Sequence, residues 1–294
     1  MGTFSSNITK WYIQNGRKNL PWRKVVTPYR IWISEIMLQQ TQVKTVIPFY
    51  KKFIKKYPNL KSISLATEDD ILALWTGLGF YKRAKNIYRT KEIIKKEYKN
   101  KFPSKYEELI SLPGIGRSSA GAIMSIAYEE SYPILDANVK RVISRYKKIN
   151  TDEKGIVKTL WSLSKNLTPE KNIFEYTQGI MDLGATICNI RSPNCLDCPI
   201  NKTCKSAFKN FEIEYKAKKE RPKKKIFFTL AHSKKSFLLF KKNEKSFWES
   251  LWIPYDGEDF KEANILKEPA KRKIKTINHA LSHMELNITI EIVD

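Results

Sequence analysis

All four cysteines of the chain fall within seventeen residues, at Cys188, Cys195, Cys198 and Cys204, with the spacing C-x6-C-x2-C-x5-C. Four thiolates that converge on one centre suit a tetrahedral Zn²⁺ ion or a [4Fe–4S] cluster. A disulfide knot is the weaker interpretation, because nothing in the sequence indicates an oxidising compartment. Zinc ribbons usually contain two close C-x-x-C pairs, whereas only Cys195 and Cys198 form such a pair here. The spacing therefore favours the iron–sulfur cluster over zinc.

Charge is distributed unevenly along the chain. Of its 294 residues, 54 are Lys or Arg and 30 are Asp or Glu, which gives a formal net charge of +24. Residues 1–225 hold 43 basic and 20 acidic residues, whereas residues 226–294 hold 11 and 10. Codon bias toward Lys should not segregate charge in this way, so the excess favours a polyanionic partner for the first 225 residues. A solvated Lys-rich surface is the alternative.

The hydrophobic pattern predicts a helical part followed by a part with strands. Helical spacing of apolar residues occurs in seven segments, at 29–50, 69–75, 105–111, 118–127, 137–146, 156–165 and 173–187. A basic stretch at 211–225 has little apolar pattern and predicts a linker. Beyond the linker, a period of two predicts strands in IFFTLAH, SFLLFKK and ELNITIEIV. We therefore expect a helical region over 1–210 and a small domain over 226–294.

Composition excludes several classes of protein. Apolar residues make up 41% of the chain, which is enough for a folded core. No run of eighteen apolar residues occurs, so we expect no membrane span. The N-terminus lacks the pattern of a secretory signal, and we expect a cytoplasmic protein.

Residues 105–127 predict two helices joined by the turn Pro-Gly-Ile-Gly, in which Gly114 and Gly116 permit tight backbone geometry. The first N–H groups of the second helix have no intrahelical partner and can bind a phosphate. This is the helix–hairpin–helix pattern of sequence-independent DNA-backbone binding. A plain αα-hairpin could use the same turn, but the basic charge of the region favours DNA.

Glu35 is the one charged residue in the apolar segment 31–43. Helical spacing predicts that Gln39 and Gln42 share its face of a helix, where they could contact the edges of bases. A lone carboxylate in apolar surroundings has a raised pKa, as a general acid requires. The alternative is that the carboxylate of Glu35 only bonds a buried backbone group.

Asp136 follows Pro133 and is placed to cap a helix that begins near Ala137. Cap hydrogen bonds and the helix dipole predict a lowered pKa and an ionised carboxylate. Most Asp residues in such positions are caps and nothing more, which is the alternative. One carboxyl group with a raised pKa and one with a lowered pKa form the pair used in glycosidic bond cleavage, where an anion stabilises an oxocarbenium-like sugar.

Six motifs together resemble the adenine DNA glycosylases of the MutY type, in the helix–hairpin–helix iron–sulfur glycosylase superfamily. They are SEIMLQQTQV, WTGLGFYKRAKNI, LPGIGRSSAGAI, ILDANVKRV, MDLGA and the cysteine spacing. The resemblance spans roughly residues 8–205. It implies a mainly α, two-lobed helical fold, with a six-helix lobe at about 23–134 and an iron–sulfur lobe from 1–22 plus 135–210.

The same resemblance implies roles for individual residues. Glu35 would protonate the adenine, Asp136 would stabilise or transiently trap the sugar cation, and Asn138 would support this site. The residues that wedge into the base stack as adenine is flipped out would be Gln40, Leu78 and Phe80. The four cysteines would hold a [4Fe–4S] cluster.

Endonuclease III, a relative in this superfamily, forms an imine through a Lys where this chain has Ser118. The absence of this Lys from the chain favours a glycosylase without lyase activity. Ser118 would instead belong to the DNA-binding hairpin, together with Gly114 and Gly116.

Residues 226–294 resemble the family's C-terminal α+β domain, which is related in fold to nucleotide pyrophosphohydrolases and reads 8-oxoguanine opposite the adenine. SFWESLWIP resembles its Trp-containing turn and strand. HALSHMEL resembles its recognition loop, with Ser282 and His283 as the reading residues, although Leu281 replaces the usual Phe. No acidic metal-binding box is present, so we expect no nucleotide hydrolysis. Because the chain stops one strand after the loop, we expect a trimmed domain.

The expected function is removal of adenine mispaired with 8-oxoguanine or guanine in double-stranded DNA, by a monomeric enzyme. One alternative is an endonuclease III-like glycosylase and AP lyase on oxidised pyrimidines, against which Ser118 and the C-terminal segment argue. The other is a non-catalytic iron–sulfur DNA-binding regulator, in which Glu35 would have no role.

Overall fold

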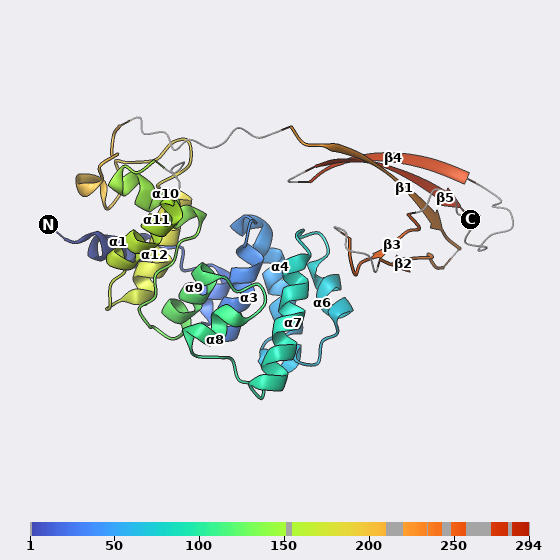
Figure 1. The fold of residues 1–294 in the computed structure, drawn as a ribbon, viewed down its shortest axis with the longest axis horizontal. Helices are drawn as coiled ribbons and strands as arrows, with labels where there is room; N and C mark the ends of the chain where they lie inside the picture. The colour runs from blue at the N-terminus through green and yellow to red at the C-terminus, as the bar shows by residue number, and fades with distance from the viewer. Residues whose placement is uncertain are drawn as a thin grey trace. The chain divides into compact units, whose positions relative to one another are not determined.

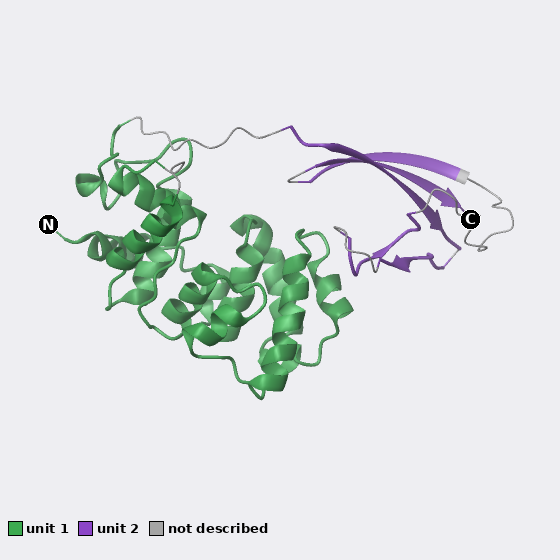
Figure 2. Cartoon of the chain, viewed as in Figure 1, with its two compact units in different colours: residues 1–215 green, residues 216–294 purple. Residues whose placement is uncertain are grey.

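The computed structural model describes residues 2–150, 155–209, 220–233, 235–242, 248–256, 272–281 and 284–293. They form two compact units, Met1–Tyr215 and Lys216–Asp294 (Figure 2). The first unit is helical and the second is built from strands (Figure 1). None of the described helices is both long enough and apolar enough to cross a bilayer.

The helices described in the first unit are α1 (Phe4–Asn15), α2 (Pro21–Lys24), α3 (Pro28–Leu38), α4 (Val43–Lys56), α5 (Leu60–Ile63), α6 (Glu68–Trp75), α7 (Lys82–Glu97), α8 (Tyr106–Ser111), α9 (Arg117–Ala127), α10 (Ala137–Lys147), α11 (Ile156–Leu167), α12 (Ile173–Thr186) and the short 3-10 helix η1 (Asn201–Thr203). All seven segments with helical spacing contain helix, so the prediction of a mainly α fold is confirmed.

Helix α3 lies at the centre of the core of the first unit. It begins at Pro28, where the Thr27 hydroxyl accepts a hydrogen bond from the N–H of Arg30 at 3.2 Å. Its residues Trp32, Ile33 and Met37 are fully buried, and the helix packs against α4, α7 and α9. The apolar segment around Glu35 is therefore a buried core helix rather than a surface one.

The segment predicted as one helix at 29–50 is two helices, α3 and α4. The break occurs because the Arg83 guanidinium binds the carbonyl oxygens of Ile36, Met37 and Gln39, which a continuing helix would use for its own hydrogen bonds. Gln39 therefore ends α3, and Gln42 precedes α4 as its N-cap. The prediction that both share a helical face with Glu35 is wrong.

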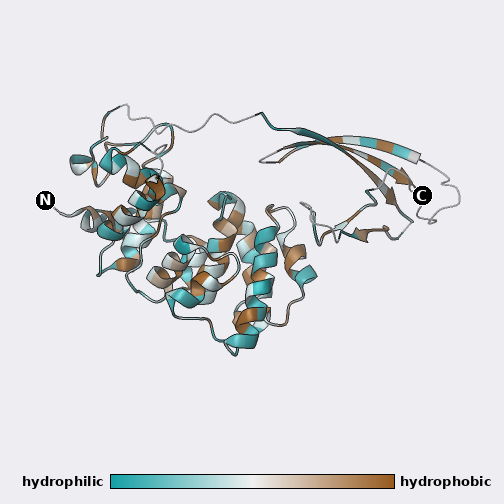
Figure 3. Cartoon of the chain, viewed as in Figure 1, coloured by the Kyte–Doolittle hydropathy of each residue, from teal (hydrophilic) through white to brown (hydrophobic). Residues whose placement is uncertain are grey.

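The hydrophobic pattern of the sequence did not predict helices α1 and α7. Hydrophilic residues dominate α7 (Figure 3) and hide the apolar spacing in its sequence. Its inner face consists of Ala84, Ile87 and Ile94, all fully buried. Tertiary packing, rather than amphipathic strength, therefore determines this helix.

The strands of the second unit are β1 (Lys223–Ala231), β2 (Phe240–Lys241), β3 (Trp252–Ile253), β4 (Arg272–Ala280) and β5 (Glu285–Val293). Strand β5 is central in a sheet of order β1-β5-β4, parallel to β1 and antiparallel to β4. Strands β2 and β3 form a separate antiparallel pair. The most buried apolar residues in the described part of the second unit are Phe228, Leu286 and Val293.

The second unit differs from the sequence-based expectation at three points. Strand β1 begins at Lys223, inside the stretch predicted as linker. Strand β4 had no prediction, because its lysines interrupt the apolar alternation. Of the predicted strand SFLLFKK, only Phe240 and Lys241 form a strand, while Phe237 makes an isolated bridge to His232.

Candidate active site and cysteine cavity

A cleft of about 1000 Å³ in the first unit brings together residues from separate predicted motifs. The predicted site residues that line it are Glu35, Gln39, Gln40, Gln42, Ser118, Asp136 and Asn138. They come from α3, the turn after it, α9 and the start of α10. The cleft lining does not include Leu78, Phe80, Gly114 or Gly116. Ser282 and His283 lie outside the described residues.

Glu35 is a carboxyl group without a partner among the described residues. Burial, and to a lesser extent the charge of Asp136, raise its pKa to about 8 against the opposing charge of Arg23. The carboxyl group is therefore largely protonated at neutral pH. A protonated acid that faces a cleft can donate its proton to a bound ligand.

Asp136 caps α10, as predicted, and its Oδ1 accepts a hydrogen bond from the N–H of Val139 at 2.8 Å. The predicted lowering of its pKa is wrong, because the pKa is raised. Burial raises the pKa of Asp136 and is the larger effect. The hydrogen bonds from the N–H groups of Val139 and Asn138 and the charge of Arg141 lower this pKa by less. When ionised, the Asp136 carboxylate raises the pKa of Glu35.

Asn138 is held in the cleft by α12 and by Arg141. The side-chain oxygen of Asn138 accepts a hydrogen bond from Arg141 Nη2 at 2.9 Å, and the same nitrogen donates to the carbonyl of Gly184 at 2.6 Å. A Cβ on Gly184 would lie 2.7 Å from the Cβ of Asn138, so only glycine permits this approach of α12. The MDLGA motif thus contributes the close packing beside Asn138.

Arg141 and Arg145 connect this site to the cysteine-containing loop. Arg141 Nε donates to the carbonyl of Cys188 at 2.8 Å. Arg145 Nη1 lies 3.5 Å from Cys188 Sγ and donates to the carbonyl of Asn189 at 2.5 Å. The residue that begins the cysteine loop is therefore fixed to the helix that begins at Asp136.

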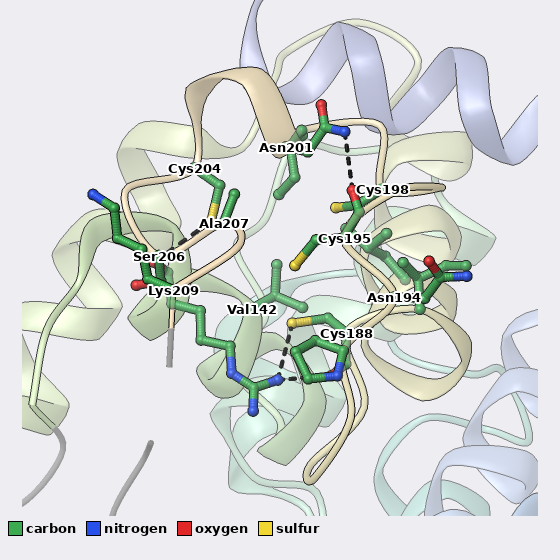
Figure 4. Close-up of a pocket in the computed structure, with 15 residues that line it drawn as sticks. Val142, Cys188, Asn194, Cys195, Cys198, Asn201, Cys204, Ser206, Ala207 and Lys209 are labelled. Carbon is green, nitrogen blue, oxygen red and sulfur yellow. Dashed lines mark hydrogen bonds between the residues drawn. The ribbon is translucent and has the colours of Figure 1, made fainter. Parts of the chain in front are cut away.

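The four cysteines line one cavity, together with apolar residues that include Val142, Leu183 and Ile187 (Figure 4). None of the four forms a disulfide bond. Burial raises the pKa of Cys198 to about 12, so a cation is needed to hold it as a thiolate. Within the described ranges, no three Cys, His, Asp or Glu side chains are grouped closely enough to hold a single metal ion.

The predicted hairpin lies between α8 and α9. Gly114 has a φ of +82°, and a Cβ there would lie 2.7 Å from Asn86 Nδ2. Gly116 is the N-cap of α9, and its N–H and that of Arg117 donate to no acceptor in the described part of the chain. Gln39 Nε2 donates to the carbonyl of Gly114 at 3.1 Å and so joins the hairpin to the end of α3. The free N–H groups at a helix start can bind a phosphate.

Ser118, predicted to stand where related lyases carry a Lys, lies in the first turn of α9. Its hydroxyl oxygen accepts a hydrogen bond from the N–H of Leu135 at 3.0 Å. Ser118 therefore links α9 to the segment that leads into Asp136, and it offers no amine to a sugar.

The three predicted wedge residues differ in exposure. Gln40 is exposed with a φ of +56°, and Phe80 is 41% exposed with a φ of +50°. Leu78 is only 5% exposed. Gln40 and Phe80 are therefore accessible at the surface of the described part of the chain, whereas Leu78 is buried.

Sequence reasoning missed the arginines of the cleft and their partner. Arg17 and Arg23 line the cleft, and both bind the fully buried Asp182 of α12. Arg23 Nη1 lies 2.7 Å from Asp182 Oδ2, and Arg17 Nε lies 2.8 Å from Asp182 Oδ1. The signal was present in MDLGA, where Asp182 is an acidic residue among apolar ones.

Comparison with known proteins identifies the family of this chain. Residues 33–166 match the family described as HhH-GPD superfamily base excision DNA repair protein. The adenine DNA glycosylase of Buchnera aphidicola subsp. Schizaphis graminum is 44% identical over 297 residues, which cover 97% of this chain and 86% of that protein. The human adenine DNA glycosylase is 35% identical over 214 residues, covering 69% of this chain and 39% of that protein.

Solved structures show the same fold in the helical unit. A thermostable thymine-DNA glycosylase matches with a TM-score of 0.61 and 30% identity, over 69% of this chain and 94% of that one. Endonuclease III in a non-covalent complex with DNA matches with a TM-score of 0.59 and 20% identity, over 69% and 92%.

Proposed function

We propose, for a chain that belongs to the adenine DNA glycosylase family of the HhH-GPD base excision repair proteins, that its substrate is adenine mispaired with 8-oxoguanine or guanine in duplex DNA. An enzyme of this family hydrolyses N-glycosyl bonds. The observation that carries the proposal is the unpaired Glu35, with a pKa of about 8, beside Asp136 in one cleft. We expect the enzyme to act as a monomer on cytoplasmic DNA.

Glu35 supplies the proton in this mechanism. The adenine, flipped out of the duplex, enters the cleft and receives the Glu35 proton on a ring nitrogen. Protonation lets the bond between the sugar and the base break, with the electron pair leaving on the base. The Glu35 carboxylate that results can then accept a proton from the water that attacks the sugar.

Asp136 supports the charge that develops on the sugar. As the base leaves, the sugar becomes an oxocarbenium-like cation, which a nearby carboxylate stabilises. The bond from the N–H of Val139 fixes the direction of the Asp136 carboxylate, and Arg141 fixes Asn138 beside it. A preorganised anion of this kind costs no reorganisation during the reaction.

DNA binding is assigned to the hairpin and to the exposed turns. The N–H groups of Gly116 and Arg117 are suited to a phosphate of the DNA backbone. The exposure and left-handed backbone of Gln40 and Phe80 support their entry into the base stack at the flipped position. Backbone binding through charge predicts an affinity that falls steeply with salt.

The cysteine cavity is assigned to a [4Fe–4S] cluster. Four cysteines that line one cavity and form no disulfide fit the four thiolate ligands of a four-iron cluster. The four cysteines would hold the cluster there, and it would cross-link the loop that Arg145 and Arg141 tie to α10. Iron analysis and absorbance near 400 nm of protein purified without oxygen test this assignment, with about four irons expected.

Recognition of the opposite base is assigned to the second unit, through Ser282 and His283. Each hydrogen bond to a base edge is worth about 1–3 kcal/mol of discrimination. Ser282→Ala combined with His283→Ala should therefore reduce the preference for 8-oxoguanine over guanine. Unchanged preference would place discrimination in the helical unit.

A duplex with one 8-oxoguanine·adenine pair, incubated with the protein and analysed with and without alkali, tests the function. Strand breaks only after alkali indicate a glycosylase without lyase activity, which Ser118 supports. Breaks without alkali indicate a lyase, and no breaks at all indicate a DNA-binding regulator.

Glu35→Gln separates the proton donor from the rest of the site. Adenine release should fall by about 10²–10⁴-fold, the usual contribution of a general acid, while duplex binding remains. The variant should unfold at no lower a temperature than the parent protein at pH 7. Burial raises the pKa of Glu35 on folding, so the unfolded chain ionises first and stability falls as pH rises from the unfolded pKa toward 8.

A further inference from the structure

Arg83, at the start of α7, has a buried guanidinium group that binds only uncharged acceptors among the described residues. Its Nη1 donates to the carbonyl oxygens of Ile36 at 3.0 Å, Met37 at 2.6 Å and Gln39 at 2.7 Å. These are the last carbonyls of α3, the helix that carries Glu35. One nitrogen thus closes the end of that helix.

The second terminal nitrogen of the guanidinium binds the turn after α3 and the turn before α7. Arg83 Nη2 donates to Thr41 Oγ1 at 3.0 Å and to the carbonyl of Gly79 at 3.1 Å. The guanidinium carbon lies 5.4 Å from the ring centre of Phe80, within the range of a cation–π contact. Burial without a carboxylate lowers the pKa of Arg83 to about 10. The positively charged guanidinium of Arg83 therefore lies in the protein interior, where its hydrogen bonds hold these carbonyl groups together.

The two turns share an unusual backbone geometry. Gln40 and Phe80 both have the left-handed conformation, with φ of +56° and +50°. Neither is a glycine, and the strain of this conformation persists only where the surroundings impose it. Arg83 bonds to the residues directly before both of them, Gln39 and Gly79. The side chains of Gln40 and Phe80, the residues that follow these two, are exposed.

We propose that Arg83 is a positioning residue that fixes Gln40 and Phe80 as one rigid pair for insertion into the base stack. The proposal rests on the proposed function, because it concerns the step that extrudes adenine. A Lys could keep the charge but not the bonds, since an ammonium group cannot direct donors to two turns as a planar guanidinium does. Arg83→Lys is therefore the informative variant.

The test compares two duplexes under single-turnover conditions. In one, adenine is paired with 8-oxoguanine; in the other, it lies opposite an abasic-site analogue, where less energy is needed to extrude it. We expect Arg83→Lys to reduce adenine release from the first duplex by at least about tenfold and from the second by less than about threefold. The fluorescence increase of 2-aminopurine placed at the target position should also be lost. Arg89→Lys, an exposed position on the same helix, is the matched control and should change neither.

Phe80→Ala keeps the test decisive if Arg83→Lys fails to fold, because it leaves the guanidinium bonds intact. It should show the same selective loss on the paired duplex. Where both variants fold, the double variant should be little worse than either single one, since the two residues act as a unit. Equal losses on both duplexes, or no loss on either, would overturn the proposal. Failure of the parent protein to release adenine from either duplex would instead overturn the proposed function.

Discussion

The charge of Asp136 raises the pKa of Glu35, and the two carboxyl groups line one cleft although 100 residues separate them in the chain. Helix α3 carries the first and the N-terminus of α10 the second. Burial is the larger cause of the raised pKa of Glu35, and the charge of Asp136 adds to it. Burial and the neighbouring carboxyl group thus act together to keep Glu35 protonated.

The pH dependence of adenine release follows from this arrangement. Glu35 acts while protonated, so the single-turnover rate should be nearly constant below about pH 8, the pKa of Glu35, and fall by about tenfold per pH unit above it. The measurement is the rate of adenine release on 8-oxoguanine·adenine duplex at saturating enzyme, from pH 6 to 9.5. A rate that rises through this range would show that the ionised form of Glu35 is the active one.

Asp136→Asn tests the interaction between the two carboxyl groups. The rate should fall because the sugar cation loses its anion. Removal of the negative charge should also lower the pKa of Glu35, so the residual activity should decline at a lower pH than in the parent protein. The pH profile of the variant measures both effects, and an unshifted profile would contradict the coupling.

The site could be predicted from the sequence only where a residue's local context determines its role. Glu35 stands out as a single charge in a core helix, and the Asp136 cap follows from the position of Pro133. The raised pKa of Asp136 could not be predicted, because it depends on burial by elements distant in the sequence. The end of α3 likewise depends on Arg83, which is 44 positions beyond Gln39.

Asp182→Asn should destabilise the helical unit. Burial alone would raise the pKa of Asp182, but its bonds to Arg23 and Arg17 lower it overall. Its contribution to stability is therefore present above the unfolded pKa of about 3.9 and is lost as pH falls through the folded value. Removal of one partner of a buried ion pair costs about 3–5 kcal/mol. Urea unfolding at pH 7 measures this loss, and the exposed Glu97→Gln should have little effect.

The two hairpin glycines should respond differently to substitution. In Gly114→Ala, the new Cβ would clash with the side chain of Asn86. The alanine would also have to adopt a φ of +82°, which costs an L-residue about 1–2 kcal/mol. Gly116→Ala has a φ of −85° and open space around its Cβ, so the fold should tolerate it. Duplex affinity, measured by fluorescence anisotropy, should fall more for Gly114→Ala. Equal affinities for the two variants would argue against a hairpin geometry that depends on Gly114.

The second unit shows the limit of sequence patterns most clearly. Alternation predicted β5 correctly, because Leu286, Ile288 and Ile290 face the same side of a sheet. Strand β4 escaped prediction because Lys273 and Lys275 share a face with Ile277, at an exposed edge where apolar residues are not required. Edge strands are determined by pairing with a neighbour, which a local pattern does not contain.

The most direct test of the account is to identify the base that the protein releases. A duplex with a single adenine opposite 8-oxoguanine is incubated with excess protein, and the free bases are separated by chromatography and identified by mass. We expect free adenine to appear in step with alkali-labile sites, and no free adenine from Glu35→Gln. Release of 8-oxoguanine, or of no base by a folded and iron-loaded protein, would contradict it.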